Sequence, residues 1–225
     1  MKIKGPSMLQ VEMGKLRRAI LDSPALVRPG CHLAPMHKVL HHPMFPLTFL
    51  LRNVMILETE AHWQSMPPHQ KRAALLSIVT ERCGVFSEVH EWLDLHRKLP
   101  AIKVVPPDAF HALPHDTGYC THCGGCCEIA SGLADFPAGT EIPPAWKRLF
   151  ADGLGANHRF CAFLWEANGQ GLSICSIHAW RPNPCRTFAV DECRNLMEDV
   201  DFCTLLDPSR LIETCRRLCV LLNGR

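Results

Sequence analysis

Four cysteines in one short segment carry the clearest chemical pattern in this 225-residue chain. Their spacing is Cys-x2-Cys-x2-Cys-Cys, and they are Cys120, Cys123, Cys126 and Cys127. A two-residue gap lets two sulfurs turn towards one point, and the glycines at 124 and 125 allow the close backbone approach that this needs. Three thiolates from such a loop, with a fourth from elsewhere, suit a tetrahedral zinc ion or one iron–sulfur cubane. The segment therefore predicts thiolate ligation of a metal and leaves both metals open.

The number and setting of the cysteines favour a reducing compartment. Thirteen occur, eleven of them between Cys120 and Cys219, and the odd count fits poorly with full disulfide pairing. The N-terminal residues lack the apolar region of a secretory signal. The most apolar stretch, 44–57, is interrupted by Arg52 and Asn53, so it is too short and too polar to span a bilayer. We therefore expect a cytoplasmic protein without a membrane span, in which close thiols mean metal or redox chemistry rather than structural disulfides.

The charge balance excludes other classes of function. The formal net charge is only +2, and the Lys and Arg residues are dispersed along the chain. A strongly basic nucleic-acid binder and an acidic disordered tail are both excluded, and no nucleic-acid partner is expected. The sequence also contains no Ser-His-Asp signature, P-loop or paired-carboxylate motif.

Four further cysteines follow in short motifs that occur in order. Cys161 begins Cys-Ala-Phe-Leu, Cys175 begins Cys-Ser-Ile-His, residues 181–188 read Arg-Pro-Asn-Pro-Cys-Arg-Thr-Phe, and Cys193 comes last. Together with the segment at 120–127, this series resembles the CxxCxxCC family of zinc- or iron-chelating domains (YkgJ-like), which includes the flagellin lysine N-methylases. The sequence departs from the family pattern at His178, where the family has a tyrosine. The resemblance covers roughly residues 118–195.

The resemblance implies a metal-binding module and does not fix a reaction. It implies eight metal ligands, which are Cys120, Cys123, Cys126, Cys127, Cys161, Cys175, Cys185 and Cys193. Arg181 and Arg186 match the same pattern and are expected at the cofactor, where a guanidinium would offset the negative charge of the thiolates. The alternative is that these arginines pin a loop to carboxylates or carbonyls. We favour an iron–sulfur cluster, of the 4Fe–4S type, over zinc, because eight candidate thiolates exceed the four that one zinc ion takes.

The other cysteines and the histidines are expected to have structural roles. Cys83, Cys215 and Cys219 fall on apolar helical stripes, Cys203 is left undecided with packing favoured, and Cys31 has no assignment. Ten of the thirteen histidines precede residue 119. Two of these, at 37 and 41, share a helical face and could bind a second metal, although solvated or interface histidines explain the same spacing more simply.

Apolar periodicity predicts that a mainly α-helical scaffold positions the candidate ligands. Helices are predicted over 8–22, about 46–62, 65–93 and 207–223. In the third, Ser65 is a candidate N-cap and Gly84 a candidate break, whereas Asp207 caps the last helix and Pro208 opens it. The predicted organisation is a helical part at 1–99, a proline-rich connector at 100–119, and an irregular metal domain at 120–225 that is closed by the C-terminal helix.

Two classes of function fit this organisation. The first is a metal or electron-handling module whose helical half binds a partner protein. The second is an enzyme, either a redox protein or an S-adenosylmethionine-dependent protein-lysine N-methyltransferase related to flagellin N-methylase. The methyltransferase interpretation rests on the resemblance alone, because the glycine-rich segment 152–157 follows no convincing strand and the radical S-adenosylmethionine spacing is absent. The sequence leaves open whether the protein is an enzyme.

Overall fold

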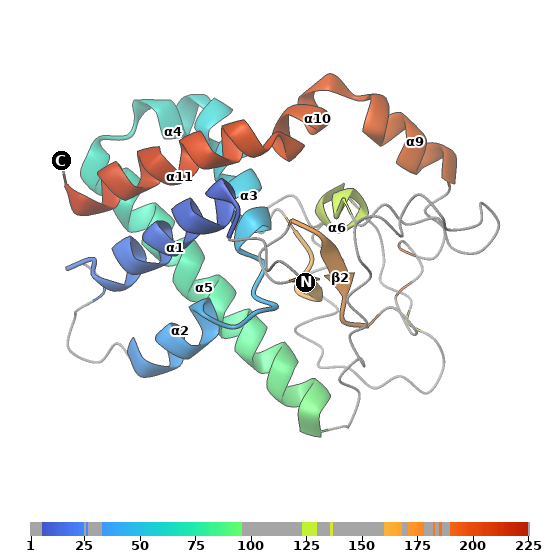
Figure 1. The fold of residues 1–225 in the computed structure, drawn as a ribbon, viewed down its shortest axis with the longest axis horizontal. Helices are drawn as coiled ribbons and strands as arrows, with labels where there is room; N and C mark the ends of the chain where they lie inside the picture. The colour runs from blue at the N-terminus through green and yellow to red at the C-terminus, as the bar shows by residue number, and fades with distance from the viewer. Residues whose placement is uncertain are drawn as a thin grey trace.

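The computed structural model describes residues 6–24, 26, 33–95, 123–129, 136, 160–167, 171–177, 182, 185 and 190–224. Helices dominate this part of the chain, and two short strands complete it (Figure 1), which confirms the prediction of a mainly α fold. The helices are α1 (Met8–Leu21), α2 (Leu33–Leu40), α3 (Leu47–Thr59), α4 (Ala61–Ser65), α5 (Pro68–Leu95), α6 (Gly125–Ile129), α9 (Val190–Glu198), α10 (Val200–Leu206) and α11 (Pro208–Asn223). The strands are β1 (Leu164–Glu166) and β2 (Ser173–Cys175).

The first and last helices begin and end where local sequence favours it. At α1 a capping box forms, in which Ser7 accepts from the Gln10 N–H while the Gln10 side chain accepts from the Ser7 N–H. At α11 the Asp207 carboxylate accepts from the Ser209 N–H, and Gly224 closes the helix with a φ of +68°. Both helices match their predicted ranges.

The long helix α5 differs from its prediction at two points. It runs without a break through Gly84, because the apolar stripe continues across that residue and one interior glycine costs only about 1 kcal/mol. The candidate cap Ser65 is instead the last residue of α4, where its hydroxyl donates to the His62 carbonyl. The helices α2, α6, α9 and α10 were not predicted.

The core forms where α11 lies along α1 (Figure 1), and α11 also packs on α3 and α5. The residues that meet here are aliphatic side chains at helical spacing. Those that are buried include Met13, Leu16 and Ile20 on α1 and Leu211, Leu218 and Leu222 on α11. Full burial of such a side chain stabilises the fold by about 1.5–3 kcal/mol. The C-terminal helix therefore packs on the helices of the N-terminal part. The predicted connector at 100–119 lies outside the described residues.

A two-stranded antiparallel hairpin is held against the first turn of α3. In the hairpin Leu164 pairs with Cys175, and the next residues along β1 follow the same register. The Glu166 carboxylate is fully buried and accepts from the Thr48 N–H at 2.8 Å, from the Thr48 hydroxyl at 2.5 Å and from the Gly171 N–H at 2.8 Å. These bonds satisfy orphan groups at the start of α3 and fix the hairpin on the bundle.

Within the described ranges, none of the helices combines the length and the apolar character that crossing a bilayer requires.

Candidate metal centre

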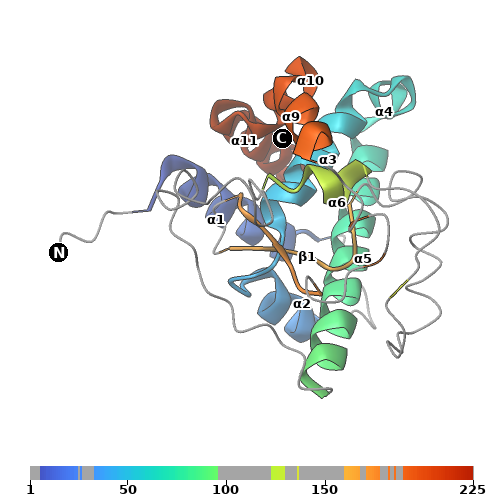
Figure 2. The same ribbon diagram turned by 90° about the vertical axis from the view of Figure 1, so that its right-hand side faces the viewer.

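Three cysteine-bearing segments meet beside the helical bundle. Cys126 and Cys127 lie on α6, Cys161 lies just before β1, and Cys175 ends β2. The Cys161 N–H donates to the Cys127 carbonyl at 2.7 Å, so the backbones of the first two segments touch. The third segment is joined to the second by the pairing of Leu164 with Cys175. Figure 2 shows α6 beside α3, with β1 below it.

The thiols of these segments interact with one another. A hydrogen bond with Cys126 and then burial raise the pKa of the Cys127 thiol well above its ordinary value, and the charges at Cys161 and Cys175 add to the rise. Burial likewise raises the pKa of Cys161, with Cys175 and Cys185 acting in the same direction. Five of the eight predicted ligands therefore lie within electrostatic reach of a neighbour in the set. The eleven cysteines in the described part of the chain are present as thiols.

The remaining predicted site residues are placed differently. Cys123 is half-buried and its sulfur accepts from the Gly125 N–H at 3.4 Å, while Cys193 lies on α9, a helix that contacts α6. Cys120, Arg181 and Arg186 lie outside the described residues. Among the residues that are described, no three or more His, Cys, Asp or Glu side chains form a group that could hold a metal ion.

A buried arginine on α3 seats the cysteine segment on the bundle. Arg52 is 1% exposed, its Nη1 donates to the Cys123 carbonyl at 2.6 Å, and its Nη2 pairs with the Glu128 carboxylate. The guanidinium also lies over the rings of Phe49 and Phe202, at 4.9 and 5.1 Å from their centroids. Burial lowers the pKa of Arg52 and raises that of Glu128 to about 7, in each case against the opposing effect of the partner.

A second buried arginine, on α5, holds the segment that contains Cys161. The Nη2 of Arg82 donates to the Phe160 carbonyl at 3.0 Å, and its guanidinium carbon lies 3.8 Å from the centroid of the Phe160 ring. Burial lowers the pKa of Arg82 to about 10, while Glu81 and Cys161 oppose the change. Two cations from the helical part thus lie against the cysteine segments.

Sequence reasoning missed both of these arginines and selected Arg181 and Arg186 instead. A signal was present, because Arg52 interrupts the apolar stretch 44–57 and Arg82 lies on the apolar stripe of α5 between Val79 and Phe86. A charged residue on a buried helical face requires a specific partner. The sequence does not reveal that the partners are carbonyls more than 70 residues away.

Two glycines let α6 pack closely on the bundle. Gly124 has a φ of +78°, and a Cβ atom there would lie 2.2 Å from Cε1 of Phe49. At Gly125 a Cβ atom would lie 2.1 Å from Cδ2 of Leu196 and 2.9 Å from Cζ of Phe202. Both positions therefore need glycine because a side chain would overlap Phe49, Leu196 or Phe202. From the sequence, these glycines were expected only to let the sulfurs approach one another.

Replacing Gly124 with alanine is expected to cost about 2–4 kcal/mol of the free energy of unfolding, because the left-handed backbone and the overlap with Phe49 both oppose a methyl group. The matched control is Gly84→Ala. That site lies inside α5 with nothing within 4 Å of the added Cβ, so the same change should stabilise the protein by about 0.5–1 kcal/mol. Urea unfolding of both variants measures the difference, and equal effects would contradict the assigned close contact.

The cysteines outside the predicted ligand set differ in their burial. Cys83 and Cys215 are buried in the core, and Cys219 packs against it, as predicted. Cys203, which the sequence left undecided with packing favoured, is exposed, and its thiol donates to the Met197 carbonyl at 3.2 Å, so it does not pack in the core. The cause is its position on α10, a short helix that buries Phe202 and leaves the opposite side in solvent. Cys31 lies outside the described residues.

A pair of histidines links the turn after α2 with α5 and the hairpin. The rings of His42 and His90 lie 5.0 Å apart, and the His90 ring stacks on that of Trp165 in β1 at 5.8 Å. The Met44 N–H donates to Nδ1 of His42 at 3.2 Å, while the Met44 carbonyl accepts from the Glu166 N–H at 3.0 Å. Since Nδ1 accepts a hydrogen bond, this contact requires a His42 ring that is unprotonated at that nitrogen.

Acidification is expected to weaken the fold through this histidine. Burial, then His90 and then Lys38, lower the pKa of His42 in the folded protein. The unfolded chain has a histidine pKa of about 6.5, so below that pH it binds a proton that the folded protein does not, and stability falls. In His42→Asn, whose Oδ1 can accept from the Met44 N–H, the loss below about pH 6.5 should be smaller. The exposed His62→Asn is the control in urea unfolding at several pH values, and a pH dependence that is the same in both variants would exclude this role of His42.

The fold and site together describe a mainly α-helical protein in which two buried arginines hold cysteine-bearing segments against the bundle. Comparison with protein families, with curated proteins and with solved structures finds no match for the chain.

Proposed function

We propose that this protein binds a metal centre through its cysteine cluster, with an iron–sulfur cluster of the 4Fe–4S type favoured over zinc. The ligands would come from Cys123, Cys126, Cys127, Cys161, Cys175, Cys185 and Cys193, together with Cys120. The observation that carries the proposal is the contact between three cysteine-bearing segments that lie far apart in the chain, in which the Cys161 N–H donates to the Cys127 carbonyl and Leu164 pairs with Cys175. Cysteines at ligand spacing are rarely grouped in this way without a metal or redox role.

The donor set fits such a group in its chemistry. Thiolates are the soft ligands that zinc and iron–sulfur clusters take, and the number of candidate sulfurs exceeds what one zinc ion needs. The burial of Cys127 and Cys161 supports ligation, since a bound cation is what would hold these sulfurs as thiolates in an apolar setting. A bound cluster would supply one-electron transfer, whereas zinc would supply structural support only.

The two buried arginines have a function in this proposal. Four thiolates around such a centre leave net negative charge, and burying that charge is unfavourable unless cations lie near it. Arg52 donates to the Cys123 carbonyl and Arg82 to the Phe160 carbonyl, beside Cys161, and the guanidinium charges interact with both cysteines. They would therefore stabilise the thiolate form of the site and raise the reduction potential of a cluster. We place the protein in the cytoplasm, where the thiols stay reduced.

Anaerobic purification followed by metal analysis and visible absorbance tests the proposal. Stoichiometric iron and sulfide, with a broad absorbance that dithionite bleaches, would support the cluster. Stoichiometric zinc in colourless protein would support the metal centre and exclude its redox version. Protein that retains neither metal after anaerobic reconstitution with iron and sulfide, or with zinc, would overturn the proposal.

A further inference from the structure

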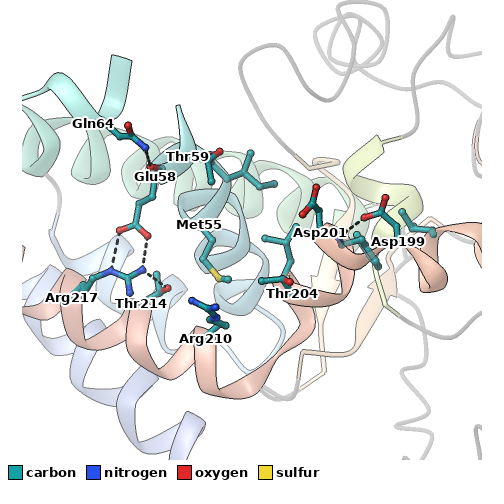
Figure 3. Close-up of a pocket in the computed structure, with 14 residues that line it drawn as sticks. Met55, Glu58, Thr59, Gln64, Asp199, Asp201, Thr204, Arg210, Thr214 and Arg217 are labelled. Atoms are coloured by element: carbon teal, nitrogen blue, oxygen red, sulfur yellow. Dashed lines mark hydrogen bonds and ion pairs between the residues drawn. The ribbon is translucent and has the colours of Figure 1, made fainter. Parts of the chain in front are cut away.

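A second site lies in a cavity of about 790 Å³ bounded by α3, α4, α10 and α11 (Figure 3). Its volume is in the range of small-molecule sites, which is about 300–1,000 Å³. Apolar side chains form its floor, and most of them are only half-buried. They are Met55, Ile56, Leu196, Phe202 and Leu205. Unlike the packed core, this floor still has apolar surface that an apolar molecule could cover.

Most charged groups around the cavity already have a role within the fold. At one end Glu58 accepts from Arg217 at 2.6 and 3.4 Å, as the dashed lines in Figure 3 show. At the other end Asp199 caps α10 by accepting from the Phe202 N–H at 2.7 Å. Asp201 lies in the first turn of the same helix, where a negative charge is favourable.

Arg210 is the other cation that lines the cavity, and it takes part in none of these interactions. It is exposed, and its guanidinium makes no hydrogen bond or ion pair with any residue that the structure describes. It stands in the first turn of α11, where the helix dipole disfavours a positive charge and where the Asp207 carboxylate that caps the helix accepts from the Ser209 N–H rather than from Arg210. Figure 3 shows Arg210 beneath Met55, so the charge lies next to the apolar floor. Helix stability therefore does not account for an arginine at this position.

We propose that the cavity binds a small molecule that has an apolar body and a carboxylate. The apolar body lies on Met55, Ile56 and Leu205, and the carboxylate pairs with the guanidinium of Arg210. This site is separate from the cysteine cluster but shares a wall with it, because Phe202 also packs against Gly125 of α6. The molecule that binds therefore contacts a side chain on which the cysteine segment rests.

Calorimetric titration of the intact protein with decanoate, below its micellar concentration, tests the proposal. Decylamine has the same apolar chain with the opposite charge and should bind more weakly by about 10-fold or more. Arg210→Gln should lose that preference by weakening decanoate binding about 10-fold, and Arg210→Lys should keep most of it. The control is Arg216→Gln, since Arg216 lies on the same helix and pairs with Glu12.

Three results would overturn the proposal. The first is equal affinity of the wild-type protein for decanoate and decylamine, and the second is no binding of either molecule. The third is an Arg210→Gln variant that binds decanoate as the Arg216→Gln variant does. Both arginines are exposed, so neither change should disturb folding, and far-ultraviolet circular dichroism of each variant verifies this. Metal content is not part of the readout, so this test is independent of the cysteine cluster.

Discussion

Replacing Arg52 with methionine is expected to lower the free energy of unfolding by about 3–5 kcal/mol. The change removes the donor to the Cys123 carbonyl and leaves the Glu128 carboxyl buried without its partner. The packing of the side chain between Phe49 and Phe202 is retained in part by the methionine, so the loss reports mainly on the polar contacts. Urea unfolding of the metal-free, reduced protein measures it.

An exposed arginine provides the matched control for this experiment. Arg217 also pairs with a carboxylate, that of Glu58, but its side chain is 46% exposed. Arg217→Met should therefore cost no more than about 1 kcal/mol. The double variant Arg52→Met/Glu128→Leu, which removes both buried partners, should be more stable than Arg52→Met alone. If Arg52→Met costs no more than Arg217→Met, the contacts of Arg52 do not hold the cysteine segment in place.

Loss of bound metal is the second large effect, expected when Cys123 is replaced by serine. A serine hydroxyl is a poor substitute for a thiolate at a zinc or iron–sulfur site, so the metal bound per chain should fall towards zero. Metal analysis after anaerobic reconstitution measures the fall, with unfolding followed in parallel. The expectation rests on the proposed function.

The chain offers two controls for that substitution. Cys219 is half-buried like Cys123 and packs against the core, and Cys215 is fully buried on the same helix. Serine at either position should leave the bound metal unchanged, with Cys215→Ser lowering stability because it puts a hydroxyl into an apolar site. Equal loss of metal in all three variants would mean that the division of the cysteines into ligands and packing residues is wrong.

The helices that could be predicted from the sequence are those with an apolar stripe and a local cap. The stripes on α5 and α11 are read directly from spacing, and Asp207 with Pro208 fixes the start of α11 to the residue. The helices α9 and α10 were missed because each is short, with 9 and 7 residues, and packs on α6 and α11, which lie elsewhere in the chain. Helices of this length depend on tertiary contacts for most of their stability.

The candidate metal site, like the fold, could be predicted from the sequence only in part. Ligand spacing at 120–127 is a local property, so the cysteine segment could be identified from the sequence. Which sulfurs meet depends on the backbone contact between Cys127 and Cys161, and this joins segments that no spacing rule relates. The contributions of Arg52 and Arg82 were missed for the same reason, since each acts through a carbonyl in a distant loop.

The packing of α11 on α1 has a consequence for biosynthesis. The apolar face of α1 has its main partner in residues 208–223, so during translation it emerges from the ribosome long before that partner exists. The segment that carries the cysteines is also made before α11, so its sulfurs become available while the bundle is still incomplete. Such long-range contacts slow folding and leave apolar surface exposed in the nascent chain. The apolar face of α1 and the cysteine segment are therefore exposed together during the same interval of synthesis.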